Sequence, residues 1–197
     1  GIMGKACERL GRRNIYDATG TQFMPINTLF QLIADTENPC LPLERADRFL
    51  MIPDLLNYWL SGVLSNELTI ASTSQCLNVR TRDWAWELLS KAGIPQRLFG
   101  ELVRPGTILA PLRGVEGLTP DIVAVGAHDT ASAVAAIPVP KEGKWGCLST
   151  GTWALIGAEI PEPIFSDEAY EYSYTNEIGV EGGIRFMKNI TGMWIYQ

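Results

Sequence analysis

Histidine, long apolar runs and clusters of positive charge are scarce in this chain of 197 residues. Its single histidine, His128, leaves too few ligands for a zinc site of the usual kind. Its uncharged runs fall short of the about 18 apolar residues that a membrane-spanning helix needs. Lys and Arg number 16 against 22 Asp and Glu, a net charge of −6. We therefore expect neither a membrane nor a nucleic acid as partner.

Other signatures are missing as well. The cysteines, at positions 7, 40, 76 and 147, form no CxxC pair, which is typical of reduced thiols in a cytoplasmic protein. No secretory signal opens the chain, and no residue is predicted to be a metal ligand. Neither GxxxxGK[ST] nor GxGxxG occurs, so a Walker-type or dinucleotide site is not predicted. A small anionic ligand stays compatible with the net charge, because backbone amides bind phosphate locally.

The chain divides best at residues 138–144, Pro-Val-Pro-Lys-Glu-Gly-Lys. This stretch is stiff and polar, as domain boundaries often are. We predict one domain over residues 1–138, a linker over 139–144 and the beginning of a second domain over 145–197.

Apolar spacing and turn residues predict elements on both sides of this boundary. Before it, three helices are expected. The first follows Pro25 and buries Leu29, Leu32 and Ile33. The second lies within 47–62, has Leu56, Trp59 and Leu60 on one face and stops at Gly62, and the third covers 83–93, with Asp83 as its N-cap and Gly93 as its end. Residues 66–75 are expected in a loop or edge strand near the surface. After the boundary, strands are expected over 145–149, 153–159, 170–176 and 184–188, followed by a helix from 189.

The most informative stretch is a β-branched run from Ile122 that ends in His128 and Asp129. It predicts a buried strand followed by a helix, and ligands collect beyond the carboxyl ends of strands in α/β proteins. Asp129 could accept a proton from a substrate hydroxyl, or simply cap the helix. His128 is either a structural residue or a hydrogen-bond donor to a polyhydroxylated ligand. Nothing like GxSxG surrounds Ser132 or Ser149, so serine hydrolysis is not favoured.

A second polar segment is Ser149-Thr150-Gly151-Thr152. Its hydroxyls and backbone amides suit phosphate oxygens, and an ordinary hairpin turn is the alternative. Asn189 could bind a sugar or cap a following helix. The residues by themselves thus indicate an α/β protein with a polar cleft at the junction of two domains.

The order of motifs resembles the FGGY carbohydrate kinases along nearly the whole chain. The matching segments are Gly20-Thr-Gln-Phe-Met-Pro-Ile-Asn-Thr-Leu-Phe-Gln31, Met51-Ile-Pro-Asp-Leu-Leu-Asn-Tyr-Trp-Leu-Ser-Gly62, Ala71-Ser-Thr-Ser-Gln75, Gly93-Ile-Pro95, Val103-Arg-Pro-Gly-Thr107, Gly126-Ala-His-Asp-Thr-Ala-Ser132, Ser149-Thr-Gly-Thr-Trp153 and Lys188-Asn-Ile-Thr-Gly-Met-Trp194. The resemblance implies an actin-like (ribonuclease H-like) α/β fold of two domains, present here as the later part of the first and the start of the second.

The resemblance also implies roles for particular residues. Asp129 matches the catalytic base, and His128, Asp129, Thr130 and Asn189 match contacts to the sugar. Gly151, Thr152 and Gln197 match contacts to ATP, which acts with Mg²⁺. The expected sugar is a ketose: the first, sixth and last segments favour L-rhamnulose, with fuculose or xylulose as alternatives. The oligomeric state is not predicted.

Two segments of the family pattern are not among these residues: the DxGxxS turn that handles phosphate and metal, and a late glycine-rich segment that holds adenosine. We therefore expect the 197 residues alone, an internal fragment by this resemblance, not to phosphorylate. A non-catalytic sugar-binding module of actin-like fold is the remaining alternative.

Overall fold

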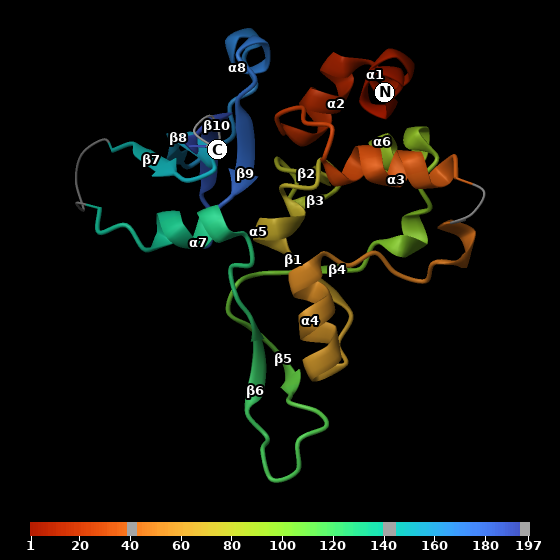
Figure 1. Ribbon diagram of the computed structural model, residues 1–197, viewed down its shortest axis with the longest axis vertical. Coiled ribbons are helices and arrows are strands. Elements are labelled where there is room, and N and C mark those ends of the chain that lie inside the picture. The colour runs from red at the N-terminus through yellow and green to blue at the C-terminus, as the bar shows by residue number, and fades with distance from the viewer. Residues whose placement is uncertain (39–42, 140–144, 194–197) are drawn as a thin grey trace.

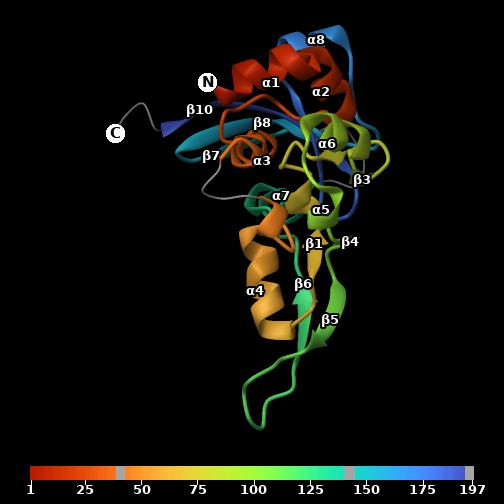
Figure 2. The same cartoon turned by 90° about the vertical axis from the view of Figure 1, so that its right-hand side faces the viewer.

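The computed structural model describes residues 1–38, 43–139 and 145–193. Three groups of elements make it up: a helical body that carries the N-terminus, a four-stranded sheet, and an arm that projects away from both (Figure 1, Figure 2). Most of the expected linker, 139–144, and Gln197 lie outside the described residues. Within the described ranges, no helix is long and apolar enough to cross a bilayer.

The helical body holds the main hydrophobic core. It comprises α1 (Ile2–Leu10), α2 (Arg12–Thr19), α3 (Thr28–Thr36), α6 (Trp86–Ala92), the short strands β2 (Leu77–Asn78) and β3 (Asp83–Trp84), and 3-10 turns at Leu43–Arg45 and Gln96–Leu98. On α3, the predicted stripe of Leu29, Leu32 and Ile33 is buried. This prediction is confirmed because the spacing i, i+3, i+4 places all three on one helix face.

Two parts of the body differ from expectation. Helices α1 and α2 were not predicted, because their sequence is polar. In the structure only a few of their side chains, such as Ile15 and Tyr16, are buried. Helix α6 starts at Trp86, so Asp83 is not its N-cap. Asp83 lies in β3, and its carboxylate accepts hydrogen bonds from Trp84 N and Trp86 Nε1. Gly93 does end α6, with a left-handed φ of 78° that glycine adopts at low cost.

Most of residues 66–75 are buried, so their expected place near the surface is wrong, although residues 66 and 67 do lie in an edge strand, which was one of the two expectations. Strand β1 (Ser65–Glu67) pairs in parallel with β4 (Glu101–Val103) and leads directly into α5 (Leu68–Ala71). Asn66, Glu67, Thr69 and Gln75 are all 0% exposed. These polar side chains can lie inside because they are hydrogen-bonded.

The arm consists of α4 (Ile52–Ser61) and the antiparallel pair β5 (Thr107–Pro111) and β6 (Asp121–Ala124). Gly62, with φ 75°, ends α4 as predicted. The strand expected at Ile122 is present. Its predicted burial is wrong, since Val123 is 39% exposed on a ribbon of only two strands.

The sheet follows the expected boundary in the chain. It contains β7 (Cys147–Thr150), β8 (Trp153–Ile160), β9 (Thr175–Ile178) and β10 (Ile184–Thr191) in the antiparallel order β7-β8-β10-β9, with α8 (Asp167–Glu171) before β9 and α7 (Asp129–Ala135) close to β7 (Figure 1). Tyr170 lies in α8 rather than in a strand. Asn189 pairs with Leu155 of β8 inside β10, so a helix start at 189 is wrong: the ladder with β8 continues to Thr191.

Candidate active site

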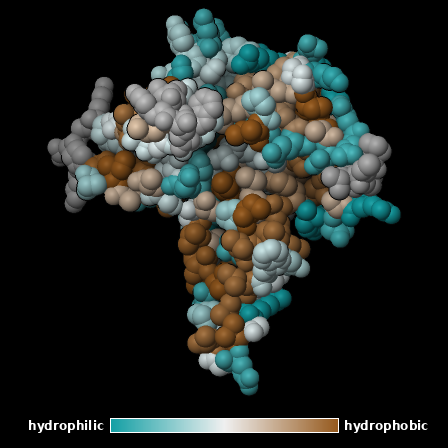
Figure 3. Space-filling model, in the orientation of Figure 1, coloured by the Kyte–Doolittle hydropathy of each residue, from teal (hydrophilic) through white to brown (hydrophobic). Residues whose placement is uncertain are grey.

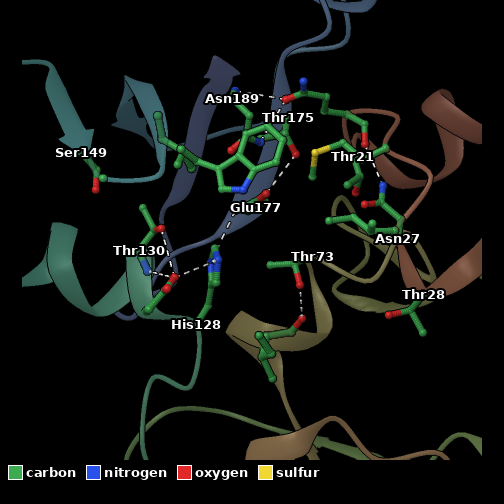
Figure 4. Close-up of a pocket in the computed structure, with 18 of the residues that line it drawn as sticks. Thr21, Asn27, Thr28, Thr73, His128, Thr130, Ser149, Thr175, Glu177 and Asn189 are labelled. Atoms are coloured by element: carbon green, nitrogen blue, oxygen red, sulfur yellow. Dashed lines mark hydrogen bonds and ion pairs between the residues drawn. The ribbon is translucent and has the colours of Figure 1, made fainter. Parts of the chain in front are cut away.

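A cavity of about 730 Å³ opens where the start of α7, the β7–β8 turn and the loop before α3 meet. Its lining includes every residue that the sequence predicts for the site except Gln197: His128, Asp129, Thr130, Gly151, Thr152 and Asn189. Figure 4 shows His128 and Thr130 below this space and Asn189, Thr175 and Glu177 above it. Tertiary structure thus gathers residues from both sides of the expected domain boundary.

The carboxylate of Asp129 stands at the beginning of α7. His128 is the N-cap residue and Asp129 the first helical residue. Asp129 Oδ1 accepts hydrogen bonds from Thr130 N at 2.5 Å and from Thr130 Oγ1 at 3.2 Å. The Asp129 side chain is 94% exposed, so it remains accessible from the cavity that it lines. This placement suits a helix-start residue and a reactive carboxylate alike.

A buried carboxylate, Glu67, fixes the backbone that leads into α7. Its Oε2 accepts hydrogen bonds from Ala127 N at 3.0 Å and from Thr69 Oγ1 at 2.5 Å. Thr69 Oγ1 in turn accepts one from His128 N at 3.2 Å. The same carboxylate binds the first amides of α5. Glu67 therefore ties the position of His128 to β1 and α5.

The ring of His128 meets two charged residues from the sheet. Its Nδ1 lies 2.5 Å from Arg185 Nη2 and 3.6 Å from Glu177 Oε2, and its Nε2 lies 3.4 Å from Asp129 Oδ1. Burial lowers the pKa of His128, Arg185 lowers it further, and Glu177, Asp129 and Glu67 oppose that shift. The lowered pKa favours the neutral imidazole.

The hydroxyl-rich turn joins β7 and β8 as a hairpin, in which Gly151 N donates to Trp153 O at 2.8 Å. The hairpin turn, left open by the sequence as the alternative to a phosphate site, is what the backbone forms. The same turn lines the cavity with Ser149, Thr150 and Thr152. It can therefore present hydroxyl groups to a ligand held beside Asp129.

The opposite wall comes from the segment before α3. Gln22 Oε1 accepts hydrogen bonds from Asn189 N at 3.1 Å and from Asn189 Nδ2 at 3.0 Å. Asn27 Nδ2 donates to Gln22 O and to Gln75 Oε1. Asn189 thus joins the sheet to this loop, and it does not cap a helix. Reasoning from the sequence gave Gln22, Asn27 and Gln75 no role, although all three lie in the matching motif segments.

Glu177 and Arg185 were also missed. Arg185 lies between Ile184 and Phe186 in β10, a strand that also contains Lys188 and Asn189. Because charged residues are mostly exposed, nothing in this pattern marked Arg185 as buried or named its partner. As for metals, the described part of the chain contains no group of three or more His, Cys, Asp or Glu that could hold an ion.

Comparison with known proteins identifies the class. The model of the N-terminal domain of the FGGY family of carbohydrate kinases matches residues 1–136, and the chain belongs to that family. Its similar relatives include the rhamnulokinases of Yersinia pestis (strain Pestoides F), 43% identical, and of Pectobacterium carotovorum subsp. carotovorum (strain PC1), 41% identical. Both matches cover all 197 residues, and the chain spans about 40% of the length of these relatives.

Solved structures agree on the fold. The glycerol kinase of Plasmodium falciparum with ADP superposes with a TM-score of 0.81 at 14% identity, over 98% of this chain and 41% of that one. The gluconate kinase of Lactobacillus acidophilus gives 0.79 at 20% identity, over 99% and 40%. The expected partial actin-like fold of a two-domain sugar kinase is confirmed.

Proposed function

We propose that these residues form part of an ATP-dependent rhamnulokinase that converts L-rhamnulose to L-rhamnulose 1-phosphate in L-rhamnose catabolism. Identity of 41–43% with rhamnulokinases along the whole chain supports this proposal. The observation that carries it is that Asp129 and the hydroxyl turn line one cavity. A base and a phosphate-facing turn that line the same cavity suit phosphoryl transfer to an alcohol.

In this proposal Asp129 is the general base. Its exposed carboxylate accepts the proton of the ketose 1-hydroxyl while that oxygen attacks the γ-phosphorus. Thr130 holds one carboxylate oxygen through two hydrogen bonds, which limits the orientations of the group. His128, Thr130 and Asn189 contact the other sugar hydroxyls. A site that hydrogen-bonds particular hydroxyls discriminates strongly among epimers.

ATP with Mg²⁺, when bound, supplies the phosphoryl group and offsets its negative charge. The donor set of the turn fits phosphate, because Thr150 and Thr152 carry exposed hydroxyls. We assign Gly151 and Thr152 to the phosphates and Gln197 to a further nucleotide contact, and no side chain to the metal.

We also propose that residues 1–138 and 145–197 belong to separate domains joined by 139–144, and that the enzyme works in the cytoplasm.

The test measures ADP release with L-rhamnulose by a full-length protein that carries this chain. We expect Asp129→Asn to reduce turnover by about 10²–10⁴-fold, since the amide cannot accept the proton. Asp121→Asn, an exposed carboxylate on the arm, is the matched control. Near-normal turnover of Asp129→Asn would show that the base is elsewhere.

The same assay separates the alternatives. A panel with fuculose and xylulose identifies another ketose as substrate if one of them is turned over faster. Calorimetric binding of L-rhamnulose without ADP release would identify a non-catalytic module. The 197 residues on their own are expected to release no ADP, and measurable release would contradict our assignment of essential phosphate contacts to segments not among them.

A further inference from the structure

We propose that Arg185 and Glu177 are positioning residues that keep the His128 ring in the tautomer with its proton on Nε2, the ring nitrogen nearest the carboxylate of Asp129. The benefit to catalysis rests on the proposed function of Asp129. The tautomer of the ring does not depend on that proposed function, and it can be measured separately. The three side chains come from the two sides of the expected domain boundary.

Hydrogen-bond chemistry determines the tautomer. A guanidinium carries donors only, and Arg185 Nη2 has two hydrogens. One points to Glu177 Oε2 at 2.7 Å and the other to His128 Nδ1 at 2.5 Å. Nδ1 must then be an acceptor, and a neutral imidazole whose Nδ1 accepts carries its proton on Nε2. Nε2 is the ring atom nearest Asp129, 3.4 Å from Oδ1.

Burial shows that this contact is not incidental. Arg185 is 0% and Glu177 5% exposed, and Arg185 Nε has no hydrogen-bond partner among the described residues. An unpartnered buried donor is costly, and a buried ion pair is often replaceable by apolar residues without loss of stability. Stability alone therefore does not explain this buried pair, whose members face each other on the neighbouring strands β10 and β9. Its contact with the histidine that adjoins Asp129 gives it a role.

The tautomer matters for the carboxylate next to it. A proton on Nε2 places a donor on the ring nitrogen that lies nearest the carboxylate proposed as general base, 3.4 Å from its Oδ1. The other tautomer would turn a lone pair toward the carboxylate and remove that donor. The charged groups that face the ring are Arg185 and Glu177 from the sheet, Asp129 from α7, and Glu67 from β1.

The chain itself offers a direct measurement, because His128 is its only histidine. With ¹⁵N in the imidazole, long-range ¹H–¹⁵N correlation spectra give one pair of ring signals and report which nitrogen carries the proton. At pH 7 we expect the Nε2-protonated form, with protonation of the ring only below the unperturbed value of about 6.5. A proton on Nδ1 in the folded, unsubstituted chain would overturn the proposal.

Substitutions then assign the cause. In Arg185→Gln, Glu177 becomes the nearest charged partner of Nδ1, so we expect the proton to move to Nδ1 and the pKa of the ring to rise. In Glu177→Gln, Arg185 still donates to Nδ1, so the tautomer should stay and the pKa should fall. Arg45→Gln removes an exposed arginine and should leave the ring signals unchanged. Unchanged signals in Arg185→Gln would refute the role of Arg185.

The test also allows for a variant, or the chain itself, that does not fold. If Arg185→Gln does not fold, the unsubstituted spectrum and Glu177→Gln still decide the question. If the chain does not fold alone, the same spectra are recorded on a full-length protein, with His128 assigned by the loss of its signals in His128→Gln. There, Arg185→Gln should lower kcat more than it changes KM and shift the acidic limb of the pH profile, with partial rescue by Arg185→Lys. Absence of kinase activity would contradict the proposed function and leave the tautomer result standing.

Discussion

The helical body and the arm contain the same kind of amphipathic helix, yet only the body buries its apolar face. On α6, Leu88 is 6% and Leu89 0% exposed, whereas on α4, Leu56 is 50% and Trp59 64% exposed. Figure 3 shows apolar residues gathered on the surface of the arm. The comparison teaches that spacing along the chain decides which face of a helix is apolar, while neighbouring elements decide whether that face is covered.

The two regions are also held differently. The body has a shared hydrophobic core, whereas the arm is attached at its base through the buried carboxylate of Asp54. That group accepts hydrogen bonds from Glu67 N at 2.9 Å, Asn66 Nδ2 at 3.1 Å and Met51 N at 3.3 Å. The β5–β6 pair adds little, because an isolated two-stranded ribbon is marginally stable. The exposed apolar side chains of α4 are therefore available for contact with another surface.

The largest difference in stability should appear when a leucine is replaced by alanine on α6 and, for comparison, on α4. We expect Leu89→Ala to lower the free energy of unfolding by about 2–5 kcal/mol, since it removes buried methyl groups and leaves a cavity. Leu56→Ala, its counterpart on α4, should change it by less than about 1 kcal/mol, because half of that side chain is already in water. Urea denaturation of both variants measures this contrast, and equal losses would mean that the α4 face is buried in solution.

The next effect concerns the base of the arm. Asp54→Ala leaves buried donors of Asn66 and Glu67 without their acceptor, at about 1–3 kcal/mol for each group. Exposed Asp47 offers the control, since Asp47→Ala should stay within about 0.5 kcal/mol. Hydrogen exchange should show faster opening of α4 in Asp54→Ala. An effect no larger than that of the control would show that the arm is held by other contacts.

A smaller effect should follow pH. Burial raises the pKa of Asp54 from 3.8 to about 6, so between these values the folded state binds more protons than the unfolded one. The contribution of Asp54 to stability is therefore present below about pH 4 and lost as the pH rises to about 6. Urea midpoints from pH 4 to 7 should show this decline in the unsubstituted chain and a smaller one in Asp54→Asn. Parallel curves would contradict the raised pKa.

The smallest effect on stability is expected on the surface of the arm. Trp59→Gln should change the free energy of unfolding by no more than about 0.5 kcal/mol, because the indole is mostly in water. We expect the unsubstituted chain to associate through the exposed apolar face of α4 as its concentration rises, and Trp59→Gln to weaken this association, since it removes the largest exposed apolar side chain of α4. Sedimentation velocity measures this, with Tyr172→Gln as an exposed aromatic control away from the arm. Equal association of both variants would mean that the chain does not associate through the α4 face.

Much of the candidate site could be predicted because its residues stand at the ends of recognisable elements. The strand near Ile122, the helix from Asp129 and the turn at Gly151 all follow from local patterns and are present. The segment containing Asn66 and Gln75 could not be predicted in the same way. A Ser- and Thr-rich sequence usually indicates a surface, and here mutual hydrogen bonds make burial possible.

The sequence by itself determined the family, the helix stops at Gly62 and Gly93, and the candidate residues of the site, because these depend on local conformation and residue type. Tertiary structure alone decided that Asn189 meets Gln22, that Arg185 reaches His128, and that α4 leaves its apolar face exposed. Such contacts join residues far apart in the chain. No local pattern encodes them, because they depend on which surfaces pack together.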